Sequence, residues 1–138
     1  MLILDTNVIS ELFKPAPAPQ VSRWVAALPG DALFTTAITR GELLFGVHRM
    51  PKSKRKTRLL QGITRIFQQR LAEHVLPYDS AAADAHAALA AARLAQGRPM
   101  SQSDAMIAGI ALSRKSTLAT RNTKDFEACG LALVNPWE

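Results

Sequence analysis

Four carboxylates stand at positions where predicted strands end or predicted helices begin. Asp5 directly follows a short apolar run, and Asp125 comes a few residues after another predicted strand. Glu42 and Asp104 each fall in the first turn of a predicted helix. Because ligands of open parallel sheets bind beyond the carboxyl ends of the strands, we expect these four side chains to gather at one edge of the sheet.

Converging carboxylates require a compensating charge. Two carboxylates 4 Å apart repel by about 4 kcal/mol at an effective dielectric constant of about 20, so a cluster is destabilising unless a cation or a proton intervenes. A site built only from oxygen ligands, without Cys or His, selects a hard ion. The pattern therefore indicates a Mg²⁺ site, with Mn²⁺ as the alternative ion.

A structural role is an alternative explanation for each acid when it is taken alone. A carboxylate near a helix N-terminus meets free amides and the positive end of the helix dipole, so Glu42 and Asp104 could be simple caps. Asp5 is harder to explain in this way, because Thr6 or Asn7 could cap the following helix without placing a charge on a core strand.

Other catalytic signatures are missing from the sequence. It contains no G-x-S-x-G, no phosphate-binding G-x-x-x-x-G-K-[ST], no G-x-G-x-x-G and no C-x-x-C. His48, His74 and His86 are scattered without ligand-like spacing. Aspartyl-phosphate hydrolases need a second Asp two residues after the first, and that position is Asn7.

The elements that must position the acids alternate between strand and helix along the chain. Strands are predicted at 2–4, 32–36, 74–77, 117–120 and 131–134, and helices at 7–13, 21–28, 39–48, 59–71, 79–96, 101–115 and 123–127. Thr39-x-x-Glu42 matches a capping box. Alternation of this kind predicts an α/β fold with a parallel sheet flanked by helices, in one domain spanning residues 1–138.

The chain is basic, with a formal net charge of +6, which favours polyanionic partners. Between Leu43 and Ala72 it has eight Lys and Arg residues but no acid. The single Cys129 excludes an internal disulfide and is interpreted as a small core residue. Without a signal-like N-terminus or a long apolar span, we expect a soluble cytoplasmic protein that does not contact a membrane.

Four ordered segments carry a family resemblance: LILDTNVISEL, TAITRGELLFG, SQSDAMIAGIA and LATRNTKDFEACGLALVNPW. They resemble the PIN-domain toxins of the VapC type, including the FitB-like branch, over essentially the whole chain. The resemblance implies a three-layer α/β/α sandwich with a central parallel sheet, and a Mg²⁺-dependent endoribonuclease of a type II toxin-antitoxin system. It further implies a homodimer and a DNA-binding, VapB-like antitoxin whose C-terminal segment blocks the acidic pocket.

The resemblance also implies roles for particular residues. Asp5, Glu42 and Asp104 match the acidic constellation of the family, with Asp5 and Asp104 as the best candidates for metal ligands. Many relatives have Asp where this chain has Asn122, so Asp125 or Asn122 fills the fourth position. The supporting residues would be Thr6 and Thr120 beside Asn122.

In the mechanism that these roles imply, water acidified by Mg²⁺ and oriented by Glu42 or Asp125 attacks an RNA phosphodiester and leaves 5′-phosphate and 3′-hydroxyl ends. Positive residues must border the acids, because the acids alone repel RNA. The candidates for phosphate contacts are Arg40, Arg121, Lys52, Lys54, Arg55 and Lys56. The basic run could equally be a solvated helix entrance.

Two further points stay open at this level. Phe13 and Trp24, with Pro15 to Pro19, form part of an antitoxin groove or pack in the core. One alternative function is a noncatalytic nucleic-acid or partner-binding module on the same fold, which would use the acids only as caps or for a structural ion. Another alternative function is a small Mg²⁺-dependent phosphatase.

Overall fold

The computed structural model describes all residues from 1 to 138. Its centre is a sheet of five parallel strands in the order β3-β2-β1-β4-β5. The strands are β1 (Leu2–Leu4), β2 (Leu33–Thr36), β3 (Val75–Leu76), β4 (Thr117–Ala119) and β5 (Ala132–Val134). The connections from β1 to β2, from β2 to β3 and from β3 to β4 each cross over through helices, as parallel pairing requires.

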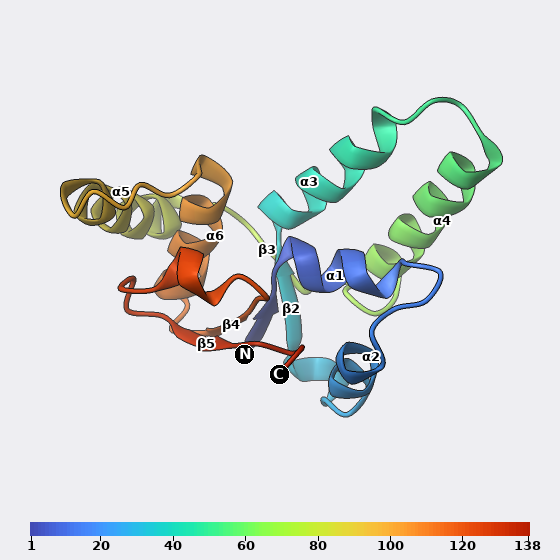
Figure 1. Cartoon of the computed structure of the whole chain (residues 1–138), viewed down its shortest axis with the longest axis horizontal. Coiled ribbons are helices and arrows are strands. Elements are labelled where there is room, and N and C mark those ends of the chain that lie inside the picture. Colours follow the sequence, from blue (N-terminus) through green and yellow to red (C-terminus); the bar gives the residue numbers. More distant parts are fainter.

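Helices cover both faces of the sheet (Figure 1). They are α1 (Thr6–Leu12), α2 (Pro19–Ala26), α3 (Ala37–His48), α4 (Lys54–Gln68), α5 (Ser80–Ala95) and α6 (Gln102–Ser113), with 3-10 helices η1 (Gly30–Ala32) and η2 (Thr123–Phe126). Figure 1 shows α5 and α6 on one side of the sheet and α1 to α4 on the other, with α3 and α4 extending outward as a hairpin.

The two hydrophobic cores follow from the alternation of side chains along each strand. Ile3 and Leu118 point into the core beneath α5 and α6. Their neighbours Leu4 and Ala119 point into the opposite core, formed with α1 to α4. Because successive residues of a strand face opposite sides, an apolar run of only three residues serves both cores. The predicted three-layer α/β/α sandwich is confirmed.

Most predicted elements are present with ends shifted by one or two residues. The exception is α4, which begins at Lys54, five residues before its predicted start, because Ser53 caps it and the basic segment forms its first turn. The start of α3 also differs from the prediction. Helix α3 begins at Ala37, and its N-cap is Thr36, whose side chain accepts a hydrogen bond from the Thr39 amide. The predicted capping box between Thr39 and Glu42 is therefore wrong. Glu42 lies in the second turn, where the backbone amides are already paired within the helix.

Cys129 is buried, as expected for a core residue. No helix of the structure has the combination of length and apolar composition that crossing a lipid bilayer demands.

Candidate active site

Asp5 occupies the end of β1, where the chain turns into α1. Its backbone amide donates to the Ala119 carbonyl, which continues the ladder to β4. Its Oδ1 accepts a hydrogen bond of 3.1 Å from the Val8 amide, and the nearby Thr120 hydroxyl and Asn7 amide also stabilise its charged form. Asp5 is thus held at the carboxyl edge of the sheet by the two neighbouring segments.

Asp5 is itself the N-cap of α1. The expectation that Thr6 or Asn7 could serve as the cap instead is wrong, because the helix begins at Thr6 and leaves the residue before it in an extended conformation. Capping is therefore one role of Asp5, but it uses only the Oδ1 oxygen of the carboxylate.

Asp5 is only 4% exposed, and burial raises the pKa of its carboxyl from 3.8 to about 6. Hydrogen bonds from Thr120 and Val8 oppose this rise, whereas the negative charge of Asp104 adds to it. A buried carboxylate with a nearby like charge and no cationic partner is typical of functional sites.

Glu42 reaches the same edge from α3 and is held by α1. Thr6 Oγ1 donates a hydrogen bond of 2.6 Å to Glu42 Oε1, and it also lies 3.1 Å from Thr39 Oγ1. Thr39 is fully buried and is hydrogen bonded in turn to Thr36. A chain of threonine hydroxyls therefore connects the end of β2 to the Glu42 carboxylate.

Asp104 is the third residue of α6. Its amide donates to the Ser101 hydroxyl oxygen, the N-cap of the helix, and the Ser101 hydroxyl in turn bonds to the Asp104 carboxylate. The pKa of Asp104 is raised, first by burial and then by the charges of Asp125 and Glu42. The reciprocal bonds make Asp104 half of a capping pair, while its like-charged neighbours show that it faces the other acids.

Asp125 lies in η2, after β4, and is exposed. The segment is held by Arg93, a buried residue of α5 whose Nη1 donates to the carbonyls of Asp125 and Glu127 at 3.1 and 2.7 Å. Asn122 is also exposed, and its amide donates to Thr120 Oγ1. Asp125 is therefore near Asp104, and Asn122 contacts the threonine that lies next to Asp5.

The four carboxylates form one electrostatic neighbourhood, since Asp104 interacts with Asp5, Glu42 and Asp125. No three Asp, Glu, His or Cys side chains converge tightly enough to enclose a metal ion in this arrangement. Mg²⁺ at phosphoryl-transfer sites is usually held by one or two carboxylates together with waters and substrate phosphates. Asp5 and Asp104 suit that mode because they supply only oxygen ligands and their repulsion would be relieved by a cation.

The predicted phosphate contacts are dispersed around this edge. Arg55 and Arg58 line a cavity between α1, α3 and α4, whereas Lys52 and Lys54 are exposed near the tip of the α3–α4 hairpin. Lys56 Nζ donates to the His48 carbonyl at the end of α3. The basic residues between Arg49 and Arg58 therefore all lie on the α3–α4 hairpin.

Arg40 and Arg121 occupy different surroundings. The Arg40 guanidinium lies over the Phe67 ring, 5.0 Å from its centroid. Two residues along a helix are separated by about 200°, so Arg40 lies on the face of α3 opposite Glu42, away from the acids. Arg121 lies over the Trp137 ring at 5.1 Å, directly after the segment that supports Asp5.

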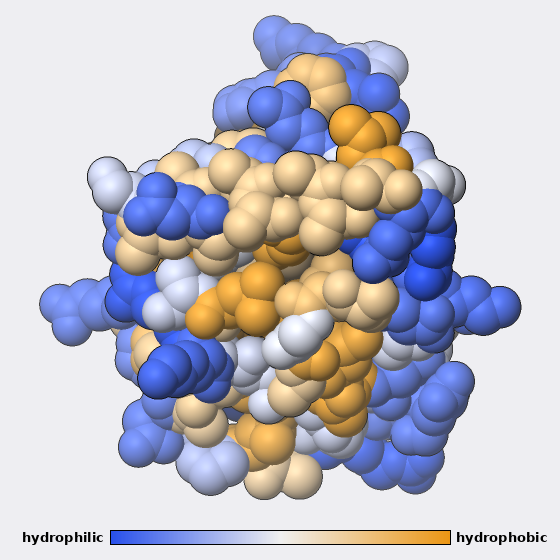
Figure 2. All heavy atoms as spheres, turned by 90° about the vertical axis from the view of Figure 1, so that its left-hand side faces the viewer, coloured by the Kyte–Doolittle hydropathy of each residue, from blue (hydrophilic) through white to orange (hydrophobic).

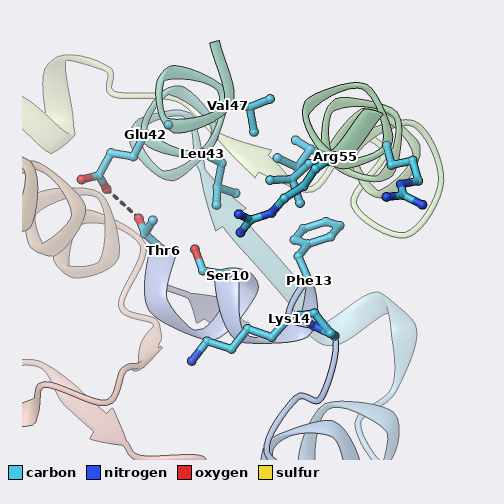
Figure 3. Close-up of a pocket in the computed structure, with 13 residues that line it drawn as sticks. Thr6, Ser10, Phe13, Lys14, Glu42, Leu43, Val47 and Arg55 are labelled. Atoms are coloured by element: carbon cyan, nitrogen blue, oxygen red, sulfur yellow. Dashed lines mark hydrogen bonds between the residues drawn. The ribbon is translucent and has the colours of Figure 1, made fainter. Parts of the chain in front are cut away.

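The cavity between α1, α3 and α4 has a volume of about 660 Å³ and adjoins Glu42 (Figure 3). Figure 3 shows Leu43, Val47 and Phe13 forming its apolar wall and Arg55 extending into it. Phe13 and Pro15 line this cavity, and Phe13 also packs against the core of α1 to α4. Trp24 does not line it and packs in the core of α1 to α4, which is one of the two expected alternatives.

Three supporting residues of the site are not among those predicted from the sequence. The sequence predicts only a helix start at Thr39 and at Ser101, and it gives no role to Arg93. A signal existed only for Ser101, because Ser-x-x-Asp at a helix start predicts mutual capping. The partners of Thr39 and Arg93 are distant in sequence, and no local pattern identifies them.

Comparison with known proteins adds independent findings. The sequence model of the PIN domain matches residues 2–130. The chain is 41% identical over 138 residues to the VapC ribonuclease Y4jK of Sinorhizobium fredii, covering 100% of this chain and 99% of that protein. It is 34% identical over 137 residues to toxin FitB of Neisseria gonorrhoeae, with 99% of both chains covered.

Among solved structures, the crystal structure of FitAcB from Neisseria gonorrhoeae contains a chain that superposes with a TM-score of 0.93. The sequence identity is 33%, and the match covers 100% of this chain and 99% of that chain. The similarity therefore includes the whole fold as well as the segments that carry the acids.

Proposed function

Since the chain belongs to the PIN domain family, we propose that it is the toxin of a type II toxin-antitoxin system and acts in the cytoplasm as a metal-dependent endoribonuclease. The observation that carries this proposal is the neighbourhood of Asp5, Glu42, Asp104 and Asp125 at the carboxyl edge of the sheet, where burial, with a smaller contribution from like charges, raises the pKa of Asp5 and Asp104. Relatives named as ribonucleases and toxins support the reaction class.

In this proposal Asp5 and Asp104 hold a divalent ion, Mg²⁺ or Mn²⁺. When bound, the ion supplies positive charge that acidifies water and offsets the charge developing on the RNA phosphate. Glu42, fixed by Thr6, accepts a proton at its carboxylate from the attacking water. Thr120 keeps Asp5 oriented, and Asp125 or Asn122 completes the acidic edge. No covalent nucleophile is involved.

The RNA backbone would approach over the α3–α4 hairpin. Lys54, Arg55 and Lys56 occupy the first turn of α4, where the helix dipole disfavours positive charge. Helix stability therefore does not explain these cations, whereas an anionic backbone does. With no aromatic residue between Arg49 and Arg58, this surface would contribute affinity without reading bases.

The antitoxin would occupy the cavity between α1, α3 and α4. An apolar wall of Leu43, Val47, Leu59 and Ile63 with Arg55 and Arg58 beside it fits an amphipathic segment that presents apolar and acidic side chains. Because the cavity adjoins Glu42 and Thr6, a segment bound there would also block the acids.

We further propose that the toxin pairs as a homodimer through α5. The exposed face of this helix carries alanines and a single charge, Asp84, and Leu94 is 67% exposed. Figure 2 shows the resulting apolar band on the side of the molecule that bears α5. Leu94→Glu should convert a dimer to a monomer in light scattering, and a wild type that is already monomeric at micromolar concentration would overturn this assignment.

The central experiment compares RNA cleavage by purified wild type, Asp5→Asn and Asp104→Asn in Mg²⁺, with Asp31→Asn as the matched control. Asp31 is an exposed acid of η1 outside the proposed site and outside the proposed dimer face. We expect wild type and Asp31→Asn to cut RNA, and the other two variants to lose about 10²-fold or more. Folded wild type that binds RNA without cutting it in Mg²⁺ or Mn²⁺ would instead support a noncatalytic binding module.

A further inference from the structure

A second cavity lies along α1, on the side that faces the segments after β4 and β5. Its volume is about 430 Å³, and it is mostly polar. The residues that line it include Asn7, Ser10, Lys14, Arg121, Asn122 and Trp137. Ser10 and Lys14 also line the cavity of Figure 3, so α1 forms a wall common to both.

The Arg121–Trp137 pair at this cavity is fixed by Asn135. Asn135 Nδ2 donates to the Arg121 carbonyl at 3.4 Å, and Asn135 Oδ1 accepts from the Trp137 amide at 2.9 Å. One amide side chain therefore holds the C-terminal segment against the loop after β4. The result is an exposed guanidinium placed over an indole ring, 5.1 Å from its centroid.

The charge of this cavity favours an anion. Glu11 is its acidic lining residue, and its carboxylate is occupied by Lys14 Nζ and the Ala18 amide, each at 2.9 Å. These bonds, with a smaller contribution from Arg121, lower the pKa of Glu11. Arg121 makes no ion pair with any carboxylate, so its charge remains available to a ligand.

The cavity also adjoins the acids of the candidate active site. Asn7 is two residues after Asp5, and its amide stabilises the charged form of the Asp5 carboxylate. The Asn122 amide donates to Thr120 Oγ1, and the Thr120 hydroxyl also stabilises the Asp5 carboxylate. Two residues that line the cavity are therefore close to Asp5, and a ligand seated here is next to the reacting phosphate.

We propose that this cavity binds one nucleotide of the RNA, the neighbour of the phosphate that is cut. The base stacks on the Arg121 guanidinium, which Trp137 supports from behind, and the edge of the guanidinium contacts a phosphate. The side-chain amides of Asn7 and Asn122 meet the base edge. The proposal rests on the ribonuclease function and adds the element that reads a base, which the basic hairpin lacks.

Nucleotide binding can be observed without catalysis. The chain has two tryptophans, Trp24 and Trp137, so an amide-proton NMR spectrum contains two indole signals, which Trp24→Phe assigns. We titrate wild type in EDTA with each of the four nucleoside 5′-monophosphates and with inorganic phosphate. At least one nucleotide should shift the Trp137 signal while the Trp24 signal stays in place.

Two variants make this test specific. Arg121→Gln should abolish the shift, whereas Arg23→Gln, which removes one charge from an exposed position of α2, should retain it. The proposal is overturned if no nucleotide at millimolar concentration moves the Trp137 signal. It is also overturned if Arg121→Gln behaves as wild type, or if inorganic phosphate reproduces the whole shift, because the cavity is then an anion site without base recognition.

Kinetics separate this inference from the ribonuclease function itself. Arg121→Lys keeps the charge but loses the planar stack, and we expect its KM for RNA to rise about fivefold or more relative to Arg23→Gln, with a smaller change in kcat. If Arg121→Lys and Arg121→Gln both match Arg23→Gln in cleavage, the nucleotide site is wrong and the ribonuclease stands. If wild type cuts no RNA but nucleotides still shift Trp137, the ribonuclease is wrong and the site stands.

Discussion

The Thr6 hydroxyl donates a 2.6 Å hydrogen bond to the Glu42 carboxylate, which joins the first turn of α1 to the second turn of α3. This bond keeps Glu42 at the edge of the sheet, beside Asp104, although nothing in α3 itself directs the side chain there. Thr6 is therefore a positioning residue in the proposed reaction.

Thr6→Val should keep the shape of this side chain and remove its hydroxyl. Loss of a hydrogen bond to a charged acceptor is worth about 1.5 to 3 kcal/mol, so we expect kcat to fall by about 10-fold or more. Thr6→Ser retains the hydroxyl and should recover most of the rate. Steady-state cleavage of an RNA oligonucleotide measures both, and equal rates for the Val and Ser variants would contradict the role.

Asp5→Asn should make the metal-free protein more stable while it abolishes cleavage. Burial raises the pKa of Asp5 to about 6, so the folded state holds its proton more tightly than the unfolded state, where the value is near 3.8. The stability that the protonated Asp5 carboxyl gives the folded state is fully present below about pH 4, and it is lost as the pH rises through about 6. The charged form therefore costs on the order of 3 kcal/mol at neutral pH.

The measurement is the difference in Tm between Asp5→Asn and wild type in EDTA, as a function of pH. The difference should grow between about pH 4 and 6 and then level off. Adding Mg²⁺ should raise the Tm of wild type and leave that of Asp5→Asn nearly unchanged. A Tm of Asp5→Asn below that of wild type at pH 7 without metal would show that the carboxylate is not strained.

The order of elements and the location of the acids could be predicted from sequence because both depend on local patterns. Pro29-Gly30 and Gly97 mark the ends of two predicted helices. Asp5 directly follows an apolar run. The rule that ligands gather at strand ends then places the acids. Local patterns also explain the error at Thr39 and Glu42, whose spacing fits a capping box although the helix starts two residues earlier.

The supporting contacts could not be predicted because they join distant residues. Thr6 and Glu42 are 36 positions apart, and Arg93 and Asp125 are 32 positions apart. Asn135 reaches back 14 positions to Arg121. Such pairs depend on how helices pack across the sheet, which hydrophobic periodicity does not specify.

Arg93→Met should destabilise the protein and raise the Mg²⁺ concentration that it needs for RNA cleavage. The Arg93 side chain is buried and bonds to the carbonyls of Arg98, Asp125 and Glu127. Removing these donors should lower the free energy of unfolding by about 2 to 4 kcal/mol and release the segment that carries Asp125. Arg93→Lys should lose less stability, since the lysine ammonium can replace some of the hydrogen bonds to these carbonyls.

Urea denaturation measures the stability of both Arg93 variants, and cleavage at increasing Mg²⁺ concentration measures the second effect. We expect the Mg²⁺ concentration for half-maximal rate to rise in Arg93→Met and to return toward wild type in Arg93→Lys. If the folded Arg93→Met protein has the metal dependence of wild type, Asp125 does not take part in metal binding.

Gly46→Leu tests where the antitoxin binds. Gly46 lines the cavity between α1, α3 and α4, and a Cβ there would meet no atom within 4 Å. The new side chain would project into the space proposed for the antitoxin segment. Because Leu is a better helix former than Gly by up to about 1 kcal/mol, α3 should not be weakened.

Gly41→Leu is the matched control, since Gly41 lies in the same helix, has equally open surroundings and does not line the cavity. Each toxin variant is mixed with the proposed antitoxin, and RNA cleavage is followed. Both variants should cut RNA alone, but only Gly41→Leu should be inhibited as strongly as wild type. Equal inhibition of the two would place the antitoxin on another surface, because a segment cannot share this cavity with an added leucine without losing contact area.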